Sequence, residues 1–504
     1  MTILDNYQEK SEFWLRKYRE AIEQGKLCVK KTRGIISAFN TNVDAIVRVS
    51  NCIEFLEETL SEPVVLERVQ KGLQDPPDAI ATISDFLVGL LSCIRTGTGA
   101  EWLVQNETVF TWLLENFQPL VRTLGGQAGL VGSALASLGV AKVYLHTFSR
   151  SYQTLETLPE FGILIPVVEN EQIGFRSPMD AINPKDETYI HWIFEFLDGT
   201  QIRVGKESIT APEDNRFIAT FDMPNMSLEI NPDFIEGIKS CINEVDKAML
   251  SGFHLLKRHY PDGTTYMDRL QPAYKEIVDW KKLNPKIRIH IEQGCIQDVI
   301  IRREVLKTLL PHIDGFGLNE DELLEILDAF EISKEFKKLK EESDAINILN
   351  GAKRVFELFN IPRMTVHTRN FSLTLLRPQY GVTPQIELYA MLLGALTAAM
   401  RAKTGEFSSI DEIDQYLKSI KSQVETEIED ITISKPGLEQ YEALAQKIDQ
   451  ISLTSKEDFL KTCIASFSGF YAIFSISLIV EDPKAIVGLG DSFTAGLLLG
   501  ELTK

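Results

Sequence analysis

The sequence has few cysteines, no long uninterrupted apolar run and a shortage of positive charge. Its six cysteines are far apart, and neither a C-x-x-C pair nor a cysteine–histidine cluster with zinc-like spacing occurs. We therefore expect buried, reduced thiols and no disulfide framework. The longest apolar stretch, residues 468–480, contains several serines and is too short to cross a bilayer as a helix.

Acidic residues outnumber basic ones, with 72 Asp and Glu against 52 Lys and Arg and a formal net charge of −20. This charge disfavours duplex nucleic acid and anionic membrane surfaces as partners, and solubility is its simplest explanation. An anionic substrate would need local cations or a metal ion to hold it. Residues 1–20 are amphipathic and lack the apolar run of a secretory signal, so we expect a soluble cytoplasmic protein.

The second half of the chain has the pattern of an α/β domain. From about residue 240, short apolar runs such as KAMLSGFHLL, KIRIHIEQG and RMTVHTRNFSLTLL alternate with amphipathic stretches. This alternation predicts a mostly parallel sheet covered by helices. Two later segments, ELYAMLLGALTAAMRAKTG and SSIDEIDQYLKSIKSQVETEI, have helical spacing and good helix formers.

Residues 45–120 and 165–230 have a different pattern of apolar and polar residues. The second of these segments contains YIHWIFEFLDGTQIRVG and NRFIATFDM, which suit antiparallel strands joined by tight turns such as Asp198-Gly199. Such an insertion in an α/β body predicts a β-rich lid over the ends of the body's strands. Because no repeat or low-complexity linker separates the two parts, we expect them to be closely coupled.

The stretch GLGDSFTAG (488–496) combines two glycines with a helix start. Gly488 and Gly490 allow close backbone approach, and the first turn of the helix leaves amide donors unpaired, which predicts an anion site. Asp491 is unexpected there, because a carboxylate repels a phosphate. It fits a general base that takes a proton from a hydroxyl attacking phosphorus. An aspartate that only stabilises the helix dipole is the alternative, and a lone G-x-G-D favours it at least equally.

Two more acidic motifs follow predicted strands. His290 and Glu292 of HIEQG share one face at a strand end, and Asn319 and Glu322 of LNEDE lie three residues apart at the next helix start. Such carboxylates can organise Mg²⁺, largely through its water ligands. NEDE taken alone is more often a helix cap. Together with GLGD, the motifs predict one crevice above the sheet, where open α/β proteins bind ligands.

The ordered set HIE, NEDE and GLGD resembles the H-x-E, N-x-x-E and G-x-G-D signatures of the archaeal ADP-dependent sugar kinases, which are members of the ribokinase-like superfamily. The resemblance covers nearly the whole chain after about residue 30. Four upstream segments look like the sugar-side segments of that family: FNTNVDAI (39–46), LGGQAG (124–129), IHWIFEF (190–196) and DNRFI (214–218).

This resemblance implies an α/β fold, with a ribokinase-like three-layer α/β/α large domain and a smaller β-rich α+β lid domain. Residues 1–44, 121–164 and 231–504 would form the large domain, and residues 45–120 and 165–230 the lid. It also implies an AMP-forming transfer of the β-phosphoryl group of ADP to a sugar, with Mg²⁺ or another divalent cation as cofactor.

The resemblance also implies roles for individual residues. Asp491 would be the base, Glu292, Glu322 and Asp491 would organise the metal, and Arg216 would stabilise charge on the transferred group. The implied nucleotide contacts are Asn319, His367, Val480, Gly488 and Gly490. The implied sugar contacts are Asn42, Asp44, Glu101, Gly125, Gly126, Gln127 and His191. For Arg216, a salt bridge on a lid strand is the alternative, and for His367 a core histidine.

The choice of sugar depends on charge. Fructose 6-phosphate is a dianion that needs basic residues on the lid, and Arg203 and Lys206 are the nearest candidates, although such a pair is often ordinary surface. Residues 212–214 (PED) stand where the family often has a basic residue. Glu101 matches an acid of glucose-using members, and an exposed turn residue is the equal alternative. We expect an ADP-dependent phosphofructokinase that also phosphorylates glucose.

Two other hypotheses stay open. One is an ATP-dependent sugar kinase of the same superfamily, which would share G-x-G-D and the metal. The other is a catalytically silent sugar-binding protein, which would have no need of a base at Asp491. The sequence carries no signature of oligomeric state.

Overall fold

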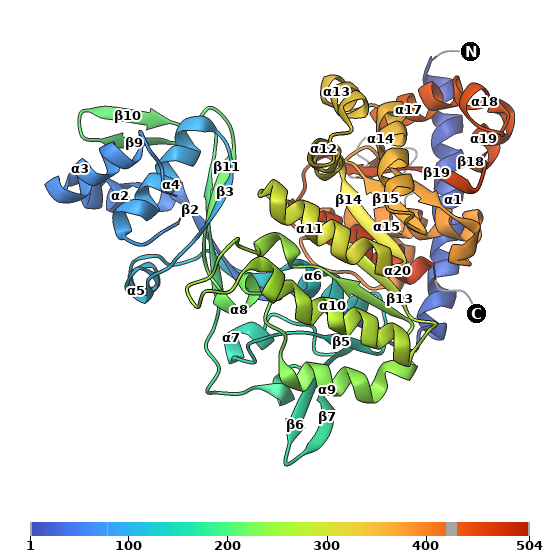
Figure 1. Ribbon diagram of the computed structural model, residues 1–504. Helices are drawn as coiled ribbons and strands as arrows, with labels where there is room; N and C mark the ends of the chain where they lie inside the picture. The colour runs from blue at the N-terminus through green and yellow to red at the C-terminus, as the bar shows by residue number, and fades with distance from the viewer. Residues whose placement is uncertain (1–2, 78, 420–430, 502–504) are drawn as a thin grey trace.

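The computed structural model describes residues 3–77, 79–419 and 431–501 and has two parts, a large body and a smaller lid (Figure 1). The body is built on an eleven-stranded sheet and the lid on a five-stranded sheet. Each part has its own cluster of buried hydrophobic side chains. The expected α/β fold with a smaller lid is confirmed.

The central strands of the body sheet are parallel. All neighbours from β15 to β6 run in the same direction, and antiparallel strands extend both edges. The carboxyl ends of the parallel strands therefore meet at one edge. The spatial order is β18 (Ile464–Phe467), β19 (Phe470–Ile476), β16 (Phe371–Leu376), β15 (Arg363–His367), β14 (Gly315–Asn319), β13 (Arg288–Glu292), β12 (Lys247–Leu250), β1 (Ile35–Ala38), β5 (Val143–Leu145), β6 (Ile163–Glu169) and β7 (Gln172–Arg176).

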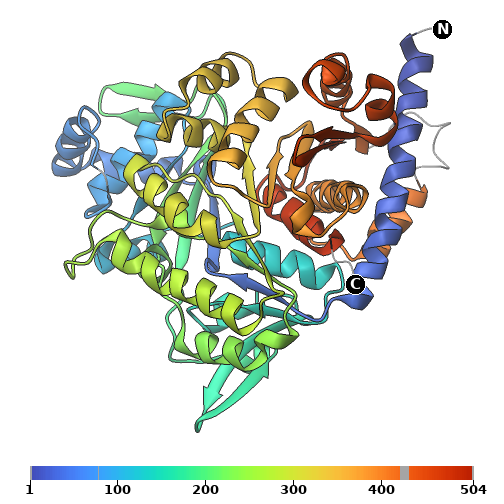
Figure 2. The ribbon, with the colours of Figure 1, turned by 45° about the vertical axis from the view of Figure 1, so that its right-hand side comes forward.

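Helices cover both faces of this sheet (Figure 2). The first face carries α6 (Gln127–Ser137), α15 (Pro384–Thr404) and α20 (Leu489–Gly500), with α1 (Ile3–Lys31) packed outside α15 and α20. The second face carries α9 (Pro232–Cys241), α10 (Tyr266–Leu283), α11 (Val299–Leu309), α12 (Glu320–Ala329) and α14 (Ala345–Leu358). The body is thus a three-layer α/β/α structure.

The remaining body elements are short. They are α7 (Tyr152–Leu155), α8 (Met223–Met226), α13 (Ser333–Glu341), α16 (Ile410–Ser419), α17 (Lys435–Ala445), α18 (Ile448–Ile451), α19 (Lys456–Thr462) and the strand pair β17 (Ile431–Ile433) and β20 (Leu478–Val480). The two helices predicted after the parallel strands are confirmed as α15 and α16, although residues 420–430 of the second lie outside the described residues.

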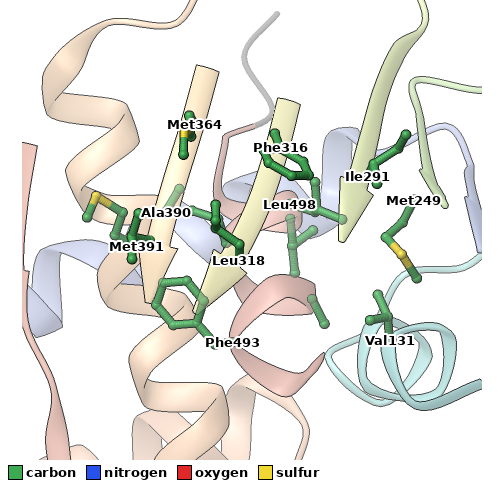
Figure 3. Close-up of a cluster of buried hydrophobic side chains, with 14 of the residues drawn as sticks. Val131, Met249, Ile291, Phe316, Leu318, Met364, Ala390, Met391, Phe493 and Leu498 are labelled. Atoms are coloured by element: carbon green, nitrogen blue, oxygen red, sulfur yellow. The ribbon is translucent and has the colours of Figure 1, made fainter. Parts of the chain in front are cut away.

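Apolar side chains fill the space around the central strands, as Figure 3 shows for Phe316 and Leu318 on β14, Met391 on α15 and Leu498 on α20. These side chains are between 0% and 1% exposed. Strand alternation places Phe316 and Leu318 on one face of β14, and its glycines on the other. The glycine face is the one that carries the candidate site.

The lid sheet has the order β3 (Ala100–Leu103), β11 (Asn215–Phe221), β8 (Ile190–Phe196), β2 (Asn42–Arg48) and β4 (Val121–Gly125). The rest of the lid is α2 (Ile53–Ser61), α3 (Pro63–Gly72), α4 (Ile83–Thr96), α5 (Glu107–Asn116) and the hairpin of β9 (Gln201–Val204) and β10 (Glu207–Thr210). The antiparallel pairing of β8 with β11 agrees with the predicted strands. Residues 45–120, in contrast, are mainly helical, so the lid is less β-rich than expected.

The predicted domain boundaries differ from the sheet topology, most clearly at residues 120 and 164. Residues 121–125 (β4) were expected in the large domain, but they pair with β2 of the lid. Residues after 164 were expected in the lid, but β6 and β7 extend the body sheet, and the chain enters the lid sheet again only at β8. Both parts contain short apolar strands, so the local pattern does not say which sheet a strand joins.

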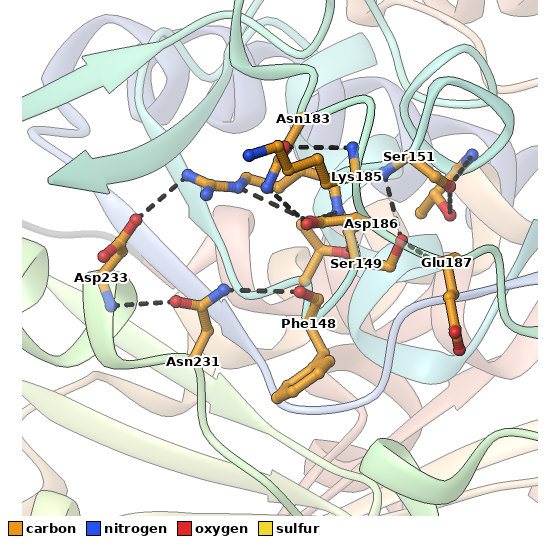
Figure 4. Close-up of polar contacts among 12 residues, drawn as sticks. Phe148, Ser149, Ser151, Asn183, Lys185, Asp186, Glu187, Asn231 and Asp233 are labelled. Carbon is orange, nitrogen blue, oxygen red and sulfur yellow. Dashed lines mark hydrogen bonds and ion pairs between the residues drawn. The ribbon is translucent and has the colours of Figure 1, made fainter. Parts of the chain in front are cut away.

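A polar network ties the crossings between body and lid to one body loop (Figure 4). The Arg150 backbone N–H donates to Asp186 Oδ2 at 2.8 Å, and its Nη1 donates to Asp233 Oδ2 at 3.1 Å. Ser149 Oγ donates to the Glu187 carbonyl at 2.5 Å. The segment of Asp186 and Glu187 leads into β8, and the segment of Asp233 leaves the lid, so both connections are held at the same place.

Most of the cysteines are buried and all six are free thiols, as expected, but Cys52 is only half-buried and Cys295 is exposed. The expectation of buried thiols is therefore wrong for Cys295, which follows the end of β13 in a surface loop. Within the described ranges, no helix is long and apolar enough to cross a membrane.

Candidate active site

The candidate site lies at the carboxyl edge of the body sheet, on the face covered by α20. His290 and Glu292 on β13 are paired in register with Gly315 and Gly317 on β14. A β-carbon at Gly317 would lie 2.1 Å from Glu292 Oε2, and one at Gly315 would lie 2.8 Å from His290 Nδ1. Because glycine has no side chain at these two positions, the side chains of His290 and Glu292 can lie over β14. The signal for this was in GFGLN, since glycines inside a strand mark a close approach.

Glu292 is 4% exposed, and both of its carboxylate oxygens are held. Oε2 accepts from His290 Nε2 at 3.1 Å and from Thr494 Oγ1 at 2.9 Å, and Oε1 accepts from His367 Nε2 at 2.9 Å. Burial alone would raise the pKa of Glu292, but the hydrogen bonds from both histidines lower it to about 2. Glu292 is a fixed anion, and Thr494 is a contact that the sequence motifs did not reveal.

Asp491 lies in the first turn of α20, which begins after Gly488 in the left-handed conformation with φ 75°. Burial, and then the nearby charge of Glu292, raise the pKa of Asp491 to about 7. Asp44 of the lid adds to this effect, so Asp491 feels charges from both the body and the lid. A carboxyl group with a pKa near neutrality suits a general base, because it can both accept and release a proton.

Asn319 and Glu322 form a capping box at the start of α12. Asn319 Oδ1 accepts from the Glu322 N–H and Glu322 Oε2 accepts from the Asn319 N–H, both at 2.9 Å. The cap interpretation of NEDE is thus correct for the local backbone. Burial, and then the charge of Glu292, raise the pKa of Glu322 to about 8, which shows that this cap lies within electrostatic range of the site.

The acidic residues fit a hydrated metal ion better than a directly ligated one. In the part of the chain that the structure describes, no group of three or more His, Cys, Asp or Glu side chains is arranged to hold a metal directly. Both oxygens of Glu292 and one oxygen of Glu322 are already engaged. The mutual repulsion of these acids with Asp491 nevertheless favours a cation near them, and Mg²⁺ usually keeps several waters as ligands.

A cavity of about 490 Å³ opens beside the start of α20. Four of the five residues predicted to contact a nucleotide line it together: Asn319, His367, Val480 and Gly490. Gly488 lies just before the helix. The lining also includes four alanines of α15, which sequence reasoning missed: Ala395, Ala398, Ala399 and Ala402. Their side chains are small and apolar, and their helical spacing was the available signal.

The lid presents the predicted sugar residues on one face of its sheet. Strand register places Asp44 opposite His191 and Glu101 opposite Ile218. His191 Nε2 lies 3.0 Å from Asp222 Oδ2, and its Nδ1 lies 3.7 Å from Glu101 Oε1. Burial would lower the pKa of His191, but these carboxylates raise it to about 9. His191 is therefore a cation at neutral pH, between two acids.

Glycines bring the end of β4 against Asn42 and Asp44. Asn42 Nδ2 donates to Asp44 Oδ1 at 2.7 Å, and a β-carbon at Gly125 would lie 2.1 Å from that same oxygen. Gly126 has φ 79°, a backbone conformation that residues other than glycine rarely adopt. Burial raises the pKa of Asp44 to about 6.

Gln127 at the start of α6 faces the same region. Its Nε2 donates to the Gln293 carbonyl at 3.1 Å. Gln127 Oε1 and Asn42 Oδ1 are buried and have no hydrogen-bond partner among the described residues. Buried acceptors without partners are costly, so both are available to hydroxyl donors of a ligand.

The predicted basic residues have different placements. Arg216 is exposed on the cleft face of the lid sheet, opposite Glu195, and within electrostatic range of Asp44. Arg203 instead forms an ion pair with Glu57 of α2, with Nη2 and Oε2 2.7 Å apart. Lys206 lies in the turn of the same β9–β10 hairpin, at the outer end of the lid (Figure 1). The structure does not bring Arg203 and Lys206 to the cleft, because this hairpin is a separate sheet that packs on the lid helices.

The chain is similar to known proteins over nearly its whole length. The family model described as the ADP-specific Phosphofructokinase/Glucokinase conserved region matches residues 33–500. The ADP-specific phosphofructokinase of Methanosarcina acetivorans is 28% identical over 501 residues, which are 98% of this chain and 98% of that one. The ADP-dependent glucose/glucosamine kinase of Pyrococcus furiosus is 27% identical over 498 residues, which are 97% of this chain and 99% of that one.

Two solved structures of ADP-dependent kinases are similar to this chain over nearly its whole length. A phosphofructokinase described as the last common ancestor of the ADP-dependent enzymes from Methanosarcinales has a TM-score of 0.83 at 28% identity, covering 97% of this chain and 99% of that one. An ADP-dependent kinase in complex with fructose-6-phosphate and ADPbetaS has a TM-score of 0.79 at 26% identity, covering 97% of each chain.

Proposed function

Because this chain belongs to the ADP-specific phosphofructokinase/glucokinase family, we propose that it transfers the β-phosphoryl group of ADP to a sugar hydroxyl and releases AMP. Fructose 6-phosphate, converted to fructose 1,6-bisphosphate, is the expected acceptor, and glucose is the second. The observation that carries the proposal is the position of Asp491. Burial, and then the charges of Glu292 of the body and Asp44 of the lid, raise its pKa to about 7, and the neighbouring Gly490 lines the cavity of about 490 Å³.

The chemistry follows from this position. The sugar oxygen attacks the β-phosphorus of ADP, the new O–P bond forms, and the bond from that phosphorus to the oxygen bridging to the α-phosphate breaks, so AMP leaves. Asp491 accepts the proton of the attacking hydroxyl. The unpaired N–H groups in the first turn of α20 face the charge that develops on the transferred group.

Arg216, the two glutamates and the lid also support this transfer. Arg216 on the cleft face of the lid can stabilise spreading charge without changing its own protonation. Glu292 and Glu322 would hold Mg²⁺ through its waters, and the ion would neutralise phosphate charge. The lid would exclude water from the cleft when it closes over the sugar.

The lid face has features for both sugars. The positive charges of His191 and the exposed Arg216 favour a sugar phosphate. They would take the role that was predicted for Arg203 and Lys206, which lie away from the cleft. Glu101, whose Oε1 accepts from Thr220 Oγ1 at 2.7 Å, favours glucose, because an acid can accept from a sugar hydroxyl. A cytoplasmic location belongs to the same proposal, since ADP and sugar phosphates are cytoplasmic metabolites.

A product assay tests the proposal. The protein is incubated with Mg²⁺, with fructose 6-phosphate or glucose, and with ADP or ATP, and AMP and phosphorylated sugar are measured. We expect both products from ADP, and at least about 100-fold slower formation of both by Asp491→Asn. Product from ATP alone would overturn the nucleotide assignment. Binding of both substrates without turnover would favour a silent sugar-binding protein.

A further inference from the structure

A buried cluster of charged side chains lies behind the site, and the reaction described above makes no use of it. Arg363 on β15, Glu387 on α15 and Glu501 after α20 are 0% exposed, and Lys247 on β12 is 1% exposed. Arg363 Nε donates to Glu387 Oε1 at 2.9 Å, and its Nη2 lies 3.2 Å from Glu501 Oε1. Lys247 Nζ lies 3.0 Å from Glu501 Oε2. Apolar residues would fill this space at less cost in desolvation, so the charges call for another explanation.

Arg363 has a third contact, which leads to the site. Its Nη1 lies 3.4 Å from His290 Nδ1, while His290 Nε2 lies 3.1 Å from Glu292 Oε2. A guanidinium group only donates hydrogen bonds and stays charged. His290 Nδ1 must therefore accept, which means that it carries no hydrogen. The ring hydrogen then lies on Nε2, where it faces the carboxylate of Glu292.

The sheet keeps this contact free of other side chains. His290 on β13, Gly315 on β14 and Arg363 on β15 lie in one row across three strands. A β-carbon at Gly315 would lie 2.8 Å from His290 Nδ1 and 3.4 Å from Arg363 Nη1. The glycine thus lets the two side chains meet above the middle strand.

The same guanidinium group also holds the far end of α20. Glu501 follows the last turn of this helix and pairs with Arg363 and Lys247, and Lys247 Nζ also donates to the Leu498 carbonyl at 2.5 Å. The first turn of α20 carries Asp491. Arg363 is therefore connected to Glu292 through His290, and to Asp491 through the helix.

We propose that Arg363 is a positioning residue, which fixes His290 as the tautomer with its hydrogen on Nε2 so that His290 holds the carboxylate of Glu292 in place. The kinetic consequence of this inference rests on the proposed function, whereas the tautomer does not. Mutation of a residue that orients the groups around a catalytic or metal site typically lowers activity or metal affinity about 10–100-fold.

Nitrogen NMR of protein with ¹⁵N-labelled histidine tests the tautomer directly. The chain has seven histidines, and the His290 signals are identified by their loss in His290→Gln. We expect a neutral His290 ring with hydrogen on Nε2. Arg363→Lys keeps the charge but loses the planar fork, so it should give a mixture of tautomers. Lys247→Met is the matched control, because it removes a charge from the same cluster without touching His290, and it should leave the His290 signals unchanged.

Two results would overturn the inference: hydrogen on Nδ1 in the wild-type protein, or an unchanged tautomer in Arg363→Lys. Neither depends on which sugar or nucleotide the protein uses. If the wild-type protein formed no AMP from ADP, the proposed function would fail while the NMR result would still decide the role of Arg363.

A second measurement works even where the Arg363 variant does not fold. The amide nitrogen of glutamine can replace His290 Nε2 as donor to Glu292, whereas the shorter asparagine reaches only the position of Nδ1. We expect His290→Gln to retain a kcat about tenfold higher than that of His290→Asn, with KM for ADP and sugar changed less than about twofold in both. Equal losses of kcat would show that His290 only fills space, and would overturn the inference.

Discussion

Gly317→Ala tests whether Glu292 must stay where the structure places it. The added methyl carbon would lie 2.1 Å from Glu292 Oε2, 2.9 Å from its Cδ and 3.0 Å from His290 Nε2. Non-bonded carbon and oxygen atoms settle at about 3.5 Å, so the carboxylate has to move by more than about 1 Å. It cannot move so far and keep its hydrogen bonds from His290, Thr494 and His367.

The size of the effect follows from these contacts. A misplacement of about 1 Å at a catalytic group costs about 100-fold in rate, so we expect kcat to fall about 100-fold with either sugar. A lost hydrogen bond to a buried charged group costs about 1.5–3 kcal/mol, and we expect the free energy of unfolding to fall by about that amount.

Steady-state kinetics with ADP and urea unfolding measure the two effects. Gly351→Ala on α14 is the matched control, because its β-carbon would meet Leu327 Cδ1 at 3.0 Å, in the core but away from the site. It should leave kcat close to that of the wild-type protein. A normal kcat and normal stability in Gly317→Ala would refute the argument that Glu292 is fixed by β14.

Three more predictions concern the reacting groups. Asp491→Asn removes the proposed base and should lower kcat by about 100- to 10,000-fold while ADP affinity, measured by calorimetry, stays within a few fold; a rate near that of the wild-type protein would exclude the base. Because burial and the charge of Glu292 raise the pKa of Asp491 to about 7, the base is protonated below that pH, so kcat/KM should fall about tenfold for each pH unit below 7 and level off above it. A profile that is flat down to pH 5 would contradict this assignment. Glu101→Ala should lower kcat/KM for glucose at least about tenfold more than for fructose 6-phosphate, because it removes an acceptor for a neutral sugar and a negative charge near an anionic one. Equal losses with both sugars would make Glu101 a structural residue.

Local sequence patterns were sufficient to predict several elements of the candidate site. The alternation of apolar runs and amphipathic stretches predicted the parallel strands that end at Glu292 and Asn319, and GLGD predicted the helix start at Asp491. The His290 and Glu292 pair on one face follows from the two-residue period of a strand. These features depend on residues within a few positions of one another, so the sequence by itself determines them.

Other features were decided only by the tertiary structure. The hydrogen bond between Thr494 and Glu292 joins residues 202 positions apart, and the contact between Arg363 and His290 spans 73 positions. The positive charge of Arg203 in the lid segment made it a plausible phosphate ligand. Its hairpin, however, packs on the lid helices, where Arg203 forms an ion pair with Glu57. Likewise, the sequences of β4, β6 and β7 do not say which sheet each strand joins, yet β4 joins the lid sheet and the other two join the body.

The physical reason is the range of the interactions. Turns, caps and strand faces are set by backbone preferences and by side chains that are neighbours along the chain, so short motifs specify them. Strand partners, ion pairs and the burial that moves the pKa of Asp491 depend on which distant segments pack together. The residues of the candidate site could thus be proposed from the sequence, whereas two residues that hold them in place, Thr494 and Arg363, emerged only once the chain was folded.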